Sequence, residues 1–95
     1  MDIVAIEALL KEILNEVSVR MVAAYAEAGS IDADHPLAQE GLSNGASIVL
    51  DYLEHNEPKT ALEHLLYMVN EPPLTLSAKA ESALARLCAA YAIHR

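Results

Sequence analysis

Apolar residues recur at helical spacing along most of the chain, beginning with its first segment. Between Asp2 and Ala28 one face of a predicted helix is formed by Ile6, Leu9, Leu10, Ile13, Val17, Met21, Ala24 and Tyr25. Asp2 is placed to cap this helix, and Gly29 is placed to end it. Additional apolar residues widen the face, namely Ile3, Val4, Leu14 and Val22. We therefore expect this helix to be central and to contact several neighbours.

The segment from Leu37 to Asn56 continues the helical pattern after a polar loop, Gly29 to His35, and a proline suited to a first turn, Pro36. Its inward face is predicted to contain Leu42, Ala46, Val49, Leu50 and Leu53. Asn44-Gly45 interrupts this pattern. The pair either breaks the helix or allows a close helix contact where a side chain is missing. We favour a short helix before Ser43 and a longer one from Ala46 to His55.

Two more helices follow. Asn56-Glu57-Pro58 predicts the start of one, with Leu62, Leu65, Leu66 and Val69 on its apolar face, and Pro72-Pro73 ends it. Ser77 is a suitable cap for the last helix, whose face contains Ala80, Leu84, Leu87, Cys88 and Tyr91. No stretch of convincing length has strand periodicity. The pattern predicts an all-α protein, a compact antiparallel bundle of four to five helices in one domain over residues 1–95, with an αα-hairpin from Ile48 to Leu66.

Composition supports this fold class and suggests a compartment. Apolar residues make up 54% of the chain, with no phenylalanine or tryptophan, which suits helix packing better than sheets. The single cysteine excludes an internal disulfide, and the first residues carry acids where a signal peptide would carry positive charge. No apolar run approaches the ~20 residues of a membrane span. We expect a soluble, cytoplasmic protein.

Charge is distributed unevenly along the chain. The net charge is −8, and no lysine or arginine occurs between Met21 and Pro58. That window contains seven acids: Glu27, Asp32, Asp34, Glu40, Asp51, Glu54 and Glu57. Nucleic acid and anionic membranes repel such a chain. A solvated acidic surface can simply keep a protein soluble, but the one-sided placement favours a face that binds a basic protein.

The candidate partner-binding residues come from this window and from the helix after it. Asp51 and Glu54, three residues apart, share the outer edge of their predicted helix, and Glu57 follows at the turn. The full candidate set is Asp32, Asp34, Asp51, Tyr52, Glu54, His55, Glu57 and Tyr67. Tyrosine beside carboxylates is a common composition for protein interfaces. Each tyrosine is equally well explained as a residue at the edge of the core with its hydroxyl in water.

Signals for catalysis or cofactors are weak. The histidines lack metal-ligand spacing and are better explained as surface residues. Asp32-Ala33-Asp34 is only a fragment of a calcium loop. Cys88 falls on an apolar face, where a buried inert thiol is usual, and Gly41 and Gly45 lack the continuation of a phosphate loop. We predict no catalytic residue, no metal and no cofactor.

Three segments over about the last half of the chain form a recognisable pattern: Ile48-Val49-Leu50-Asp51-Tyr52-Leu53-Glu54-His55-Asn56-Glu57, Ala61-Leu62-Glu63-His64-Leu65, and the Leu74-Thr75-Leu76-Ser77 connector before the final helix. This pattern resembles small bacterial immunity proteins of the Maf and contact-dependent growth inhibition type. It implies a cytoplasmic protein that neutralises a toxin. Many such toxins are nucleases with basic clefts, which an acidic surface would fit.

Two hypotheses of different classes follow. The first is an immunity protein that binds a cognate, basic, nuclease-type toxin domain. The second is a non-catalytic helical adaptor or regulatory subunit that self-associates or joins a larger complex, because the apolar face of the first helix exceeds what one neighbour needs. An enzyme ranks third and would require a perturbed carboxylate in a pocket.

Overall fold

A computed structural model describes all residues, 1–95, and its longest element is the first helix, α1 (Ile3–Ala28). The helix begins as predicted: the Asp2 carboxylate accepts a hydrogen bond from the Ala5 amide at 2.8 Å. It ends at Gly29, whose φ of +69° is in the left-handed region that favours glycine. An α-helix rises about 1.5 Å per residue, so α1 extends for about 39 Å. That is nearly the full 42 Å length of the molecule.

A loop connects α1 to the rest of the bundle and contains one short 3-10 turn, η1 (Pro36–Ala38). Pro36 occupies the first turn as predicted, and Nδ1 of His35 accepts a hydrogen bond from the Leu37 amide at 3.0 Å. Leu37 and Leu42 are buried, which holds this loop against the bundle. The short helix expected before Ser43 is therefore a single 3-10 turn.

Helices α2 (Gly45–Glu54) and α3 (Pro58–Asn70) form the predicted αα-hairpin. The break at Asn44-Gly45 is confirmed, since α2 begins at Gly45. The close helix contact considered as the alternative is also present, because Gly45 is buried and lies against the side chain of Met68. Glycine at position 45 therefore both starts the helix and permits a close contact with α3.

The last helix, α4 (Ala78–Ala90), is capped by Ser77, whose hydroxyl accepts a hydrogen bond from the Ala80 amide at 3.1 Å. The Glu16 carboxylate of α1 accepts hydrogen bonds from the Ser77 hydroxyl and the Ser77 amide, both at 2.6 Å. These two bonds, the hydroxyl first, hold the pKa of Glu16 below its ordinary value. The start of α4 is thus attached to the middle of α1.

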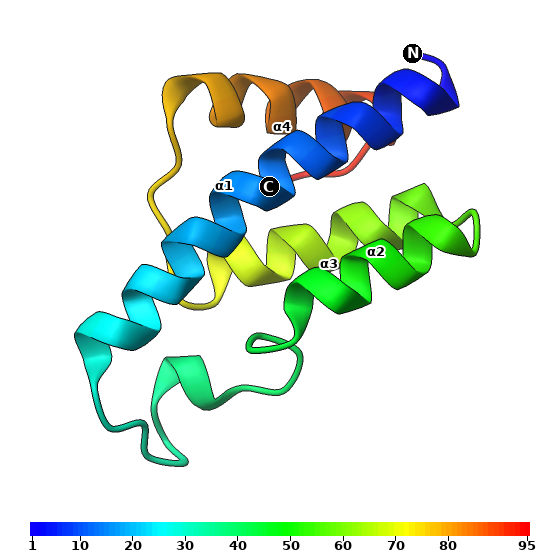
Figure 1. Ribbon diagram of the computed structural model, residues 1–95. Helices are drawn as coiled ribbons and strands as arrows, with labels where there is room; N and C mark the ends of the chain where they lie inside the picture. The colour runs from blue at the N-terminus through cyan, green and yellow to red at the C-terminus, as the bar shows by residue number, and fades with distance from the viewer.

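Figure 1 shows successive helices running in alternating directions, with α2 and α3 side by side and α4 along the other side of α1. The core is one cluster of 22 buried apolar residues drawn from all four helices and the connecting loops. Its fully buried members include Leu10, Ile13, Val17, Val49, Leu62, Leu65, Leu84 and Leu87. The predicted all-α bundle is confirmed. No helix is long and apolar enough to cross a membrane.

Four apolar side chains are more exposed than the sequence pattern predicted. On α1, Leu14 is buried, but Ile3, Val4 and Val22 are exposed rather than packed on neighbours. The helix does contact α2, α3 and α4, which together cover Leu10, Val17 and Met21 but do not reach Ile3, Val4 and Val22. On α2, Leu50 was expected to point inward and is 41% exposed.

Candidate partner-binding surface

The turn between α2 and α3 is held by backbone hydrogen bonds of the Schellman type. The Glu57 amide donates to the Tyr52 carbonyl at 2.9 Å, and the Asn56 amide donates to the Leu53 carbonyl at 3.1 Å. Asn56 adopts the left-handed conformation, φ +58°, that this motif requires. Pro58 then begins α3 immediately. Residues 54–57 therefore belong to a tight turn rather than to a flexible loop.

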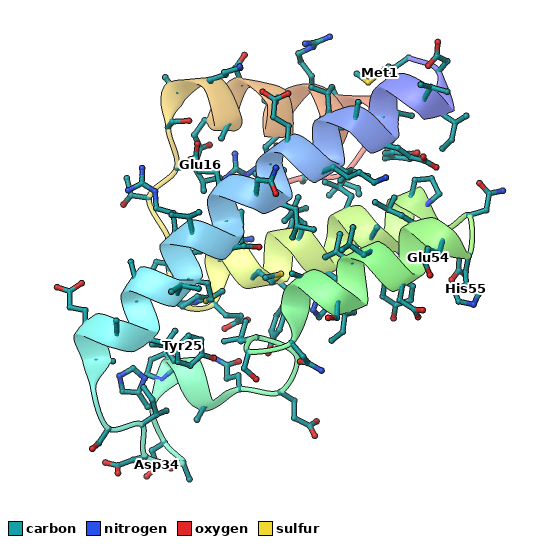
Figure 2. All side chains as sticks on the ribbon, in the orientation of Figure 1. Met1, Glu16, Tyr25, Asp34, Glu54 and His55 are labelled. Carbon is teal, nitrogen blue, oxygen red and sulfur yellow. The ribbon has the colours of Figure 1, made fainter.

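This turn presents most of the predicted binding residues together. Asp51, Glu54, His55 and Glu57 are exposed, and Tyr52 is half-buried against the core. Figure 2 shows Glu54 and His55 at the end of the hairpin, extending away from the bundle. With Leu50, which lies beside them on α2, these residues are called the hairpin edge: Leu50, Asp51, Tyr52, Glu54, His55 and Glu57.

His55 is the only cationic group paired with the acids of the hairpin edge. Its Nδ1 lies 2.8 Å from the Asp51 carbonyl oxygen and 3.5 Å from the Asp51 carboxylate. The pKa of His55 is raised, first by the hydrogen bond to that carbonyl and then by the charge of Asp51. The charges of Glu54 and Glu57 raise it further, more weakly. Protonation of His55 therefore reduces the negative charge of this edge as the pH falls.

Ion pairs with lysine and arginine lie elsewhere in the molecule. Lys79 Nζ is 3.0 Å from the Glu12 carboxylate, which joins α4 to α1, and Arg95 Nη1 is 2.6 Å from the Glu81 carboxylate. None of the seven acids in the cation-free window forms such a pair. The acids of the hairpin edge consequently have no lysine or arginine partner within the chain.

A hollow of about 230 Å³ adjoins the hairpin edge between α2 and the start of α1. It is lined by Glu7, Lys11, Leu50, Leu53 and Glu54. Leu50 thus places an exposed apolar side chain beside the carboxylate of Glu54. Sequence reasoning missed this residue, because a helical stripe does not show that α1 leaves one side of α2 uncovered.

The remaining predicted residues lie away from the hairpin edge. Asp34 is at the opposite end of the molecule from Glu54 and His55 in Figure 2, in the loop that also contains Asp32. Tyr67 lies on α3, and its hydroxyl donates a hydrogen bond to the Glu40 carbonyl at 2.7 Å. The eight predicted residues therefore do not form one continuous surface.

Tyr67 belongs to a set of side chains that attach the acidic loop to the bundle. The Tyr25 hydroxyl donates to the Leu37 carbonyl at 2.6 Å, and Nε2 of His64 lies 2.9 Å from the Gly41 carbonyl oxygen. Because a carbonyl only accepts, Nε2 of His64 is the protonated nitrogen. His35 and His64 are thus half-buried residues bound to backbone groups, not the surface histidines expected. The contacts of Tyr25, His64 and Tyr67 join residues 12 or more positions apart in the sequence, so no local pattern indicated them.

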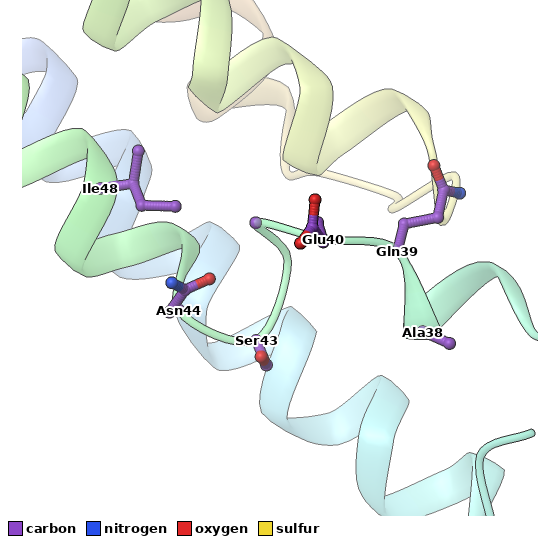
Figure 3. A pocket seen from close by; sticks show the side chains of 7 residues that line it. Ala38, Gln39, Glu40, Ser43, Asn44 and Ile48 are labelled. Atoms are coloured by element: carbon purple, nitrogen blue, oxygen red, sulfur yellow. The ribbon is translucent and has the colours of Figure 1, made fainter. Parts of the chain in front are cut away.

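Three other features bear on chemistry. An open hollow of about 710 Å³ lies beside the loop (Figure 3). It is lined by Ala38, Gln39, Glu40, Gly41, Ser43, Asn44 and Ile48. Glu40 is the only titratable residue among them. No group of three or more histidine, cysteine, aspartate or glutamate side chains is arranged to hold a metal ion. Cys88 is buried as expected, and this burial raises the pKa of its thiol.

Comparison of the chain with family models, with curated proteins and with solved structures found no match. The functional argument therefore depends on the chain's own residues.

Proposed function

We propose that this protein is an inhibitor of the immunity type, which binds a basic toxin domain in the cytoplasm through the hairpin edge. The observation that carries the proposal is that three exposed acids, Asp51, Glu54 and Glu57, surround a rigid turn and have no lysine or arginine partner in the chain. A partner that supplies cations would satisfy them. The basic cleft of a nuclease has that character.

The hairpin edge combines two properties that productive binding surfaces need. Its charges attract a basic partner over about 8 Å, the Debye length of physiological salt, which increases the association rate. Leu50 offers an exposed apolar contact beside the acids, and such anchors lengthen the life of a complex. Because the Schellman turn already holds residues 54–57 in place, little conformational entropy is lost there on binding.

The test begins with capture of the partner on immobilised protein from the cells that produce it, followed by measurement of its association rate. A triple variant, Asp51→Lys, Glu54→Lys and Glu57→Lys, changes the net charge from −8 to −2, since each reversal adds two charges. We expect it to lower the association rate at least tenfold and to abolish most of its salt dependence. The captured protein should arrest growth when expressed alone, and co-expression of the wild-type inhibitor should restore growth.

A matched control separates the hairpin edge from general electrostatics. Reversing Asp32, Asp34 and Glu40 to lysine produces the same net charge at the loop, away from the hairpin edge. We expect this loop variant to bind and protect nearly as well as the wild type. Equal loss in both variants would refute the hairpin edge as the interface, and recovery of a non-toxic multisubunit complex would favour the adaptor hypothesis.

A further inference from the structure

A hollow of about 260 Å³ lies where the second half of α1 faces the start of α2, and most of its lining is apolar. Its apolar lining residues are Met21, Val22, Tyr25, Leu42, Ala46 and Met68. Met21, Leu42 and Met68 are buried, whereas Val22 is 70% exposed. The hollow therefore leads from solvent at Val22 down to the core, and it is called the methionine hollow after its two buried methionines.

Small residues keep the methionine hollow open. Ser18 lines it on the α1 side, and Ser43 and Ala46 line it around the start of α2. Gly45, between these two, has no side chain to fill the space. Protein interiors contain few voids larger than a water molecule, so an apolar hollow of this size is a candidate binding site. The flexible thioether of Met68 in its wall adapts readily to the shape of a bound group.

The lining contains no charged side chain, and this restricts the ligand to neutral molecules. An anion is repelled by the net charge of −8, and the lining offers it no lysine or arginine. A cation finds no carboxylate in the lining to compensate the loss of its hydration. Only a neutral ligand enters this site without an unpaired charge.

Three hydroxyl groups supply the polar contacts of the methionine hollow. The Tyr25 hydroxyl, on the side of α1 that faces the loop (Figure 2), already donates a hydrogen bond to the Leu37 carbonyl and retains only its capacity to accept. The hydroxyls of Ser18 and Ser43 form no side-chain hydrogen bond within the chain and can either donate or accept. A ligand with one polar group therefore finds a partner here, while the rest of its surface meets apolar side chains.

We propose that the methionine hollow binds a neutral, flat, largely apolar small molecule that carries one hydrogen-bonding group. A dry cavity of about 150 Å³ holds a benzene ring, so the larger methionine hollow has room for two fused rings, about ten non-hydrogen atoms. The site is independent of the proposed inhibitor function, because the hollow adjoins the start of α2 at Ala46 and the hairpin edge adjoins its end at Glu54.

Titration of the isotope-labelled protein with indole tests the site by nuclear magnetic resonance. Indole is a neutral two-ring molecule with a single N–H donor. We expect saturable binding with a dissociation constant on the order of 0.1 mM. The shift changes should concentrate on the methyl groups of Met21 and Met68 and on the amides of residues 42–46. Indole-3-carboxylate, which adds a negative charge to the same ring system, should bind at least tenfold more weakly.

Variants of the lining separate this site from binding elsewhere. Ala46→Leu fills the hollow and should weaken indole binding at least tenfold. Ala8→Leu, the same substitution at an exposed position of α1 outside the hollow, is the matched control and should leave binding unchanged. Replacing Ser18 and Ser43 together by alanine should weaken binding roughly two- to tenfold, the effect of one lost hydrogen bond. Circular dichroism confirms that each variant is folded.

Several outcomes overturn the proposal. They are shift changes scattered over the surface, equal affinity for indole and its carboxylate, and binding that Ala46→Leu does not weaken. Absence of saturable binding to the wild type also overturns it. If the captured basic protein then shifts the Met21 and Met68 methyl signals instead, the hollow receives an apolar side chain of that protein and not a free small molecule.

Discussion

Gly45 is the position where addition of a single methyl group tests the packing most directly. A Cβ on Gly45 would lie 2.5 Å from both Sδ and Cε of Met68 and 3.0 Å from its Cγ. Met68 is flexible and borders a hollow of about 260 Å³, but only 1% of it is exposed, so its end must repack against other side chains to make room. Gly45→Ala must therefore displace Met68 within the core or separate α2 from α3.

Two opposing effects determine the size of the change. Alanine is favoured over glycine within a helix by up to about 1 kcal/mol. Overpacking a core by one methyl group costs about 1–3 kcal/mol. We expect a net destabilisation of about 1–2 kcal/mol, because at the first residue of α2 the helical preference is only partly realised. For a domain of this size, each kcal/mol corresponds to a fall in Tm of about 4–8 °C.

The measurement is urea unfolding followed by circular dichroism, with Met68→Ala as the second arm of a double-mutant cycle. Met68→Ala alone costs about 2–5 kcal/mol through the cavity it leaves. Combined with Gly45→Ala it removes the clash, so the double variant should be at least about 1 kcal/mol more stable than the two single effects predict. Ser47→Ala, an exposed change in the same helix, is the control and should change the free energy of unfolding little. A neutral or stabilising Gly45→Ala, or additivity in the cycle, would refute this account of the α2–α3 contact.

Three further predictions concern stability. Ala92 has a left-handed φ of +53° at the end of α4, so Ala92→Gly should stabilise the protein by about 1 kcal/mol in urea unfolding; an unchanged or lower stability would contradict this. Because hydrogen bonds from Ser77 lower the pKa of Glu16, its charged form stabilises the fold above the ordinary glutamate pKa, and this contribution disappears as the pH falls through the lowered pKa. The stability difference between the wild type and Glu16→Gln should therefore shrink on acidification, and a constant difference would argue against it. Tyr25→Phe removes the hydrogen bond to the Leu37 carbonyl and should cost about 0.5–1.5 kcal/mol, with faster amide exchange in residues 29–44 as the specific sign of a loosened loop.

Helix type and helix ends followed closely from local sequence. Asp2 and Ser77 are caps, Gly29 is a helix end, and Pro58 opens α3, each as predicted. These features depend on residues within one turn of each other, so the local sequence is enough to specify them. The same holds for most of the core, because inward positions such as Leu10 and Leu62 are the centres of their apolar stripes.

The candidate surface was only partly predictable. Asp51, Glu54 and Glu57 could be grouped because they are close in sequence and adjoin one turn. Whether Asp32 and Asp34 join them depends on where the loop between α1 and α2 lies, and that is set by bonds from Tyr25, His64 and Tyr67 to distant carbonyls. Leu50 was predicted to point inward, and the prediction is wrong because its exposure is determined by the path of α1, not by its own helix.

Local chemistry thus specified the all-α class, the ends of the helices, the uneven charge and most of the core, since each depends on spacing, caps or composition. The direction in which α1 crosses the hairpin, the contact of Gly45 with Met68, the separation of the two acidic groups and the uncovered face of α1 were decided only by the packing of whole helices. An apolar stripe shows which residues favour burial, but not how many neighbours arrive to cover them. On α1 the hairpin and α4 cover Leu10, Val17 and Met21 and leave Val4, Val19 and Val22 in solvent, because no further helix is present to cover the opposite face.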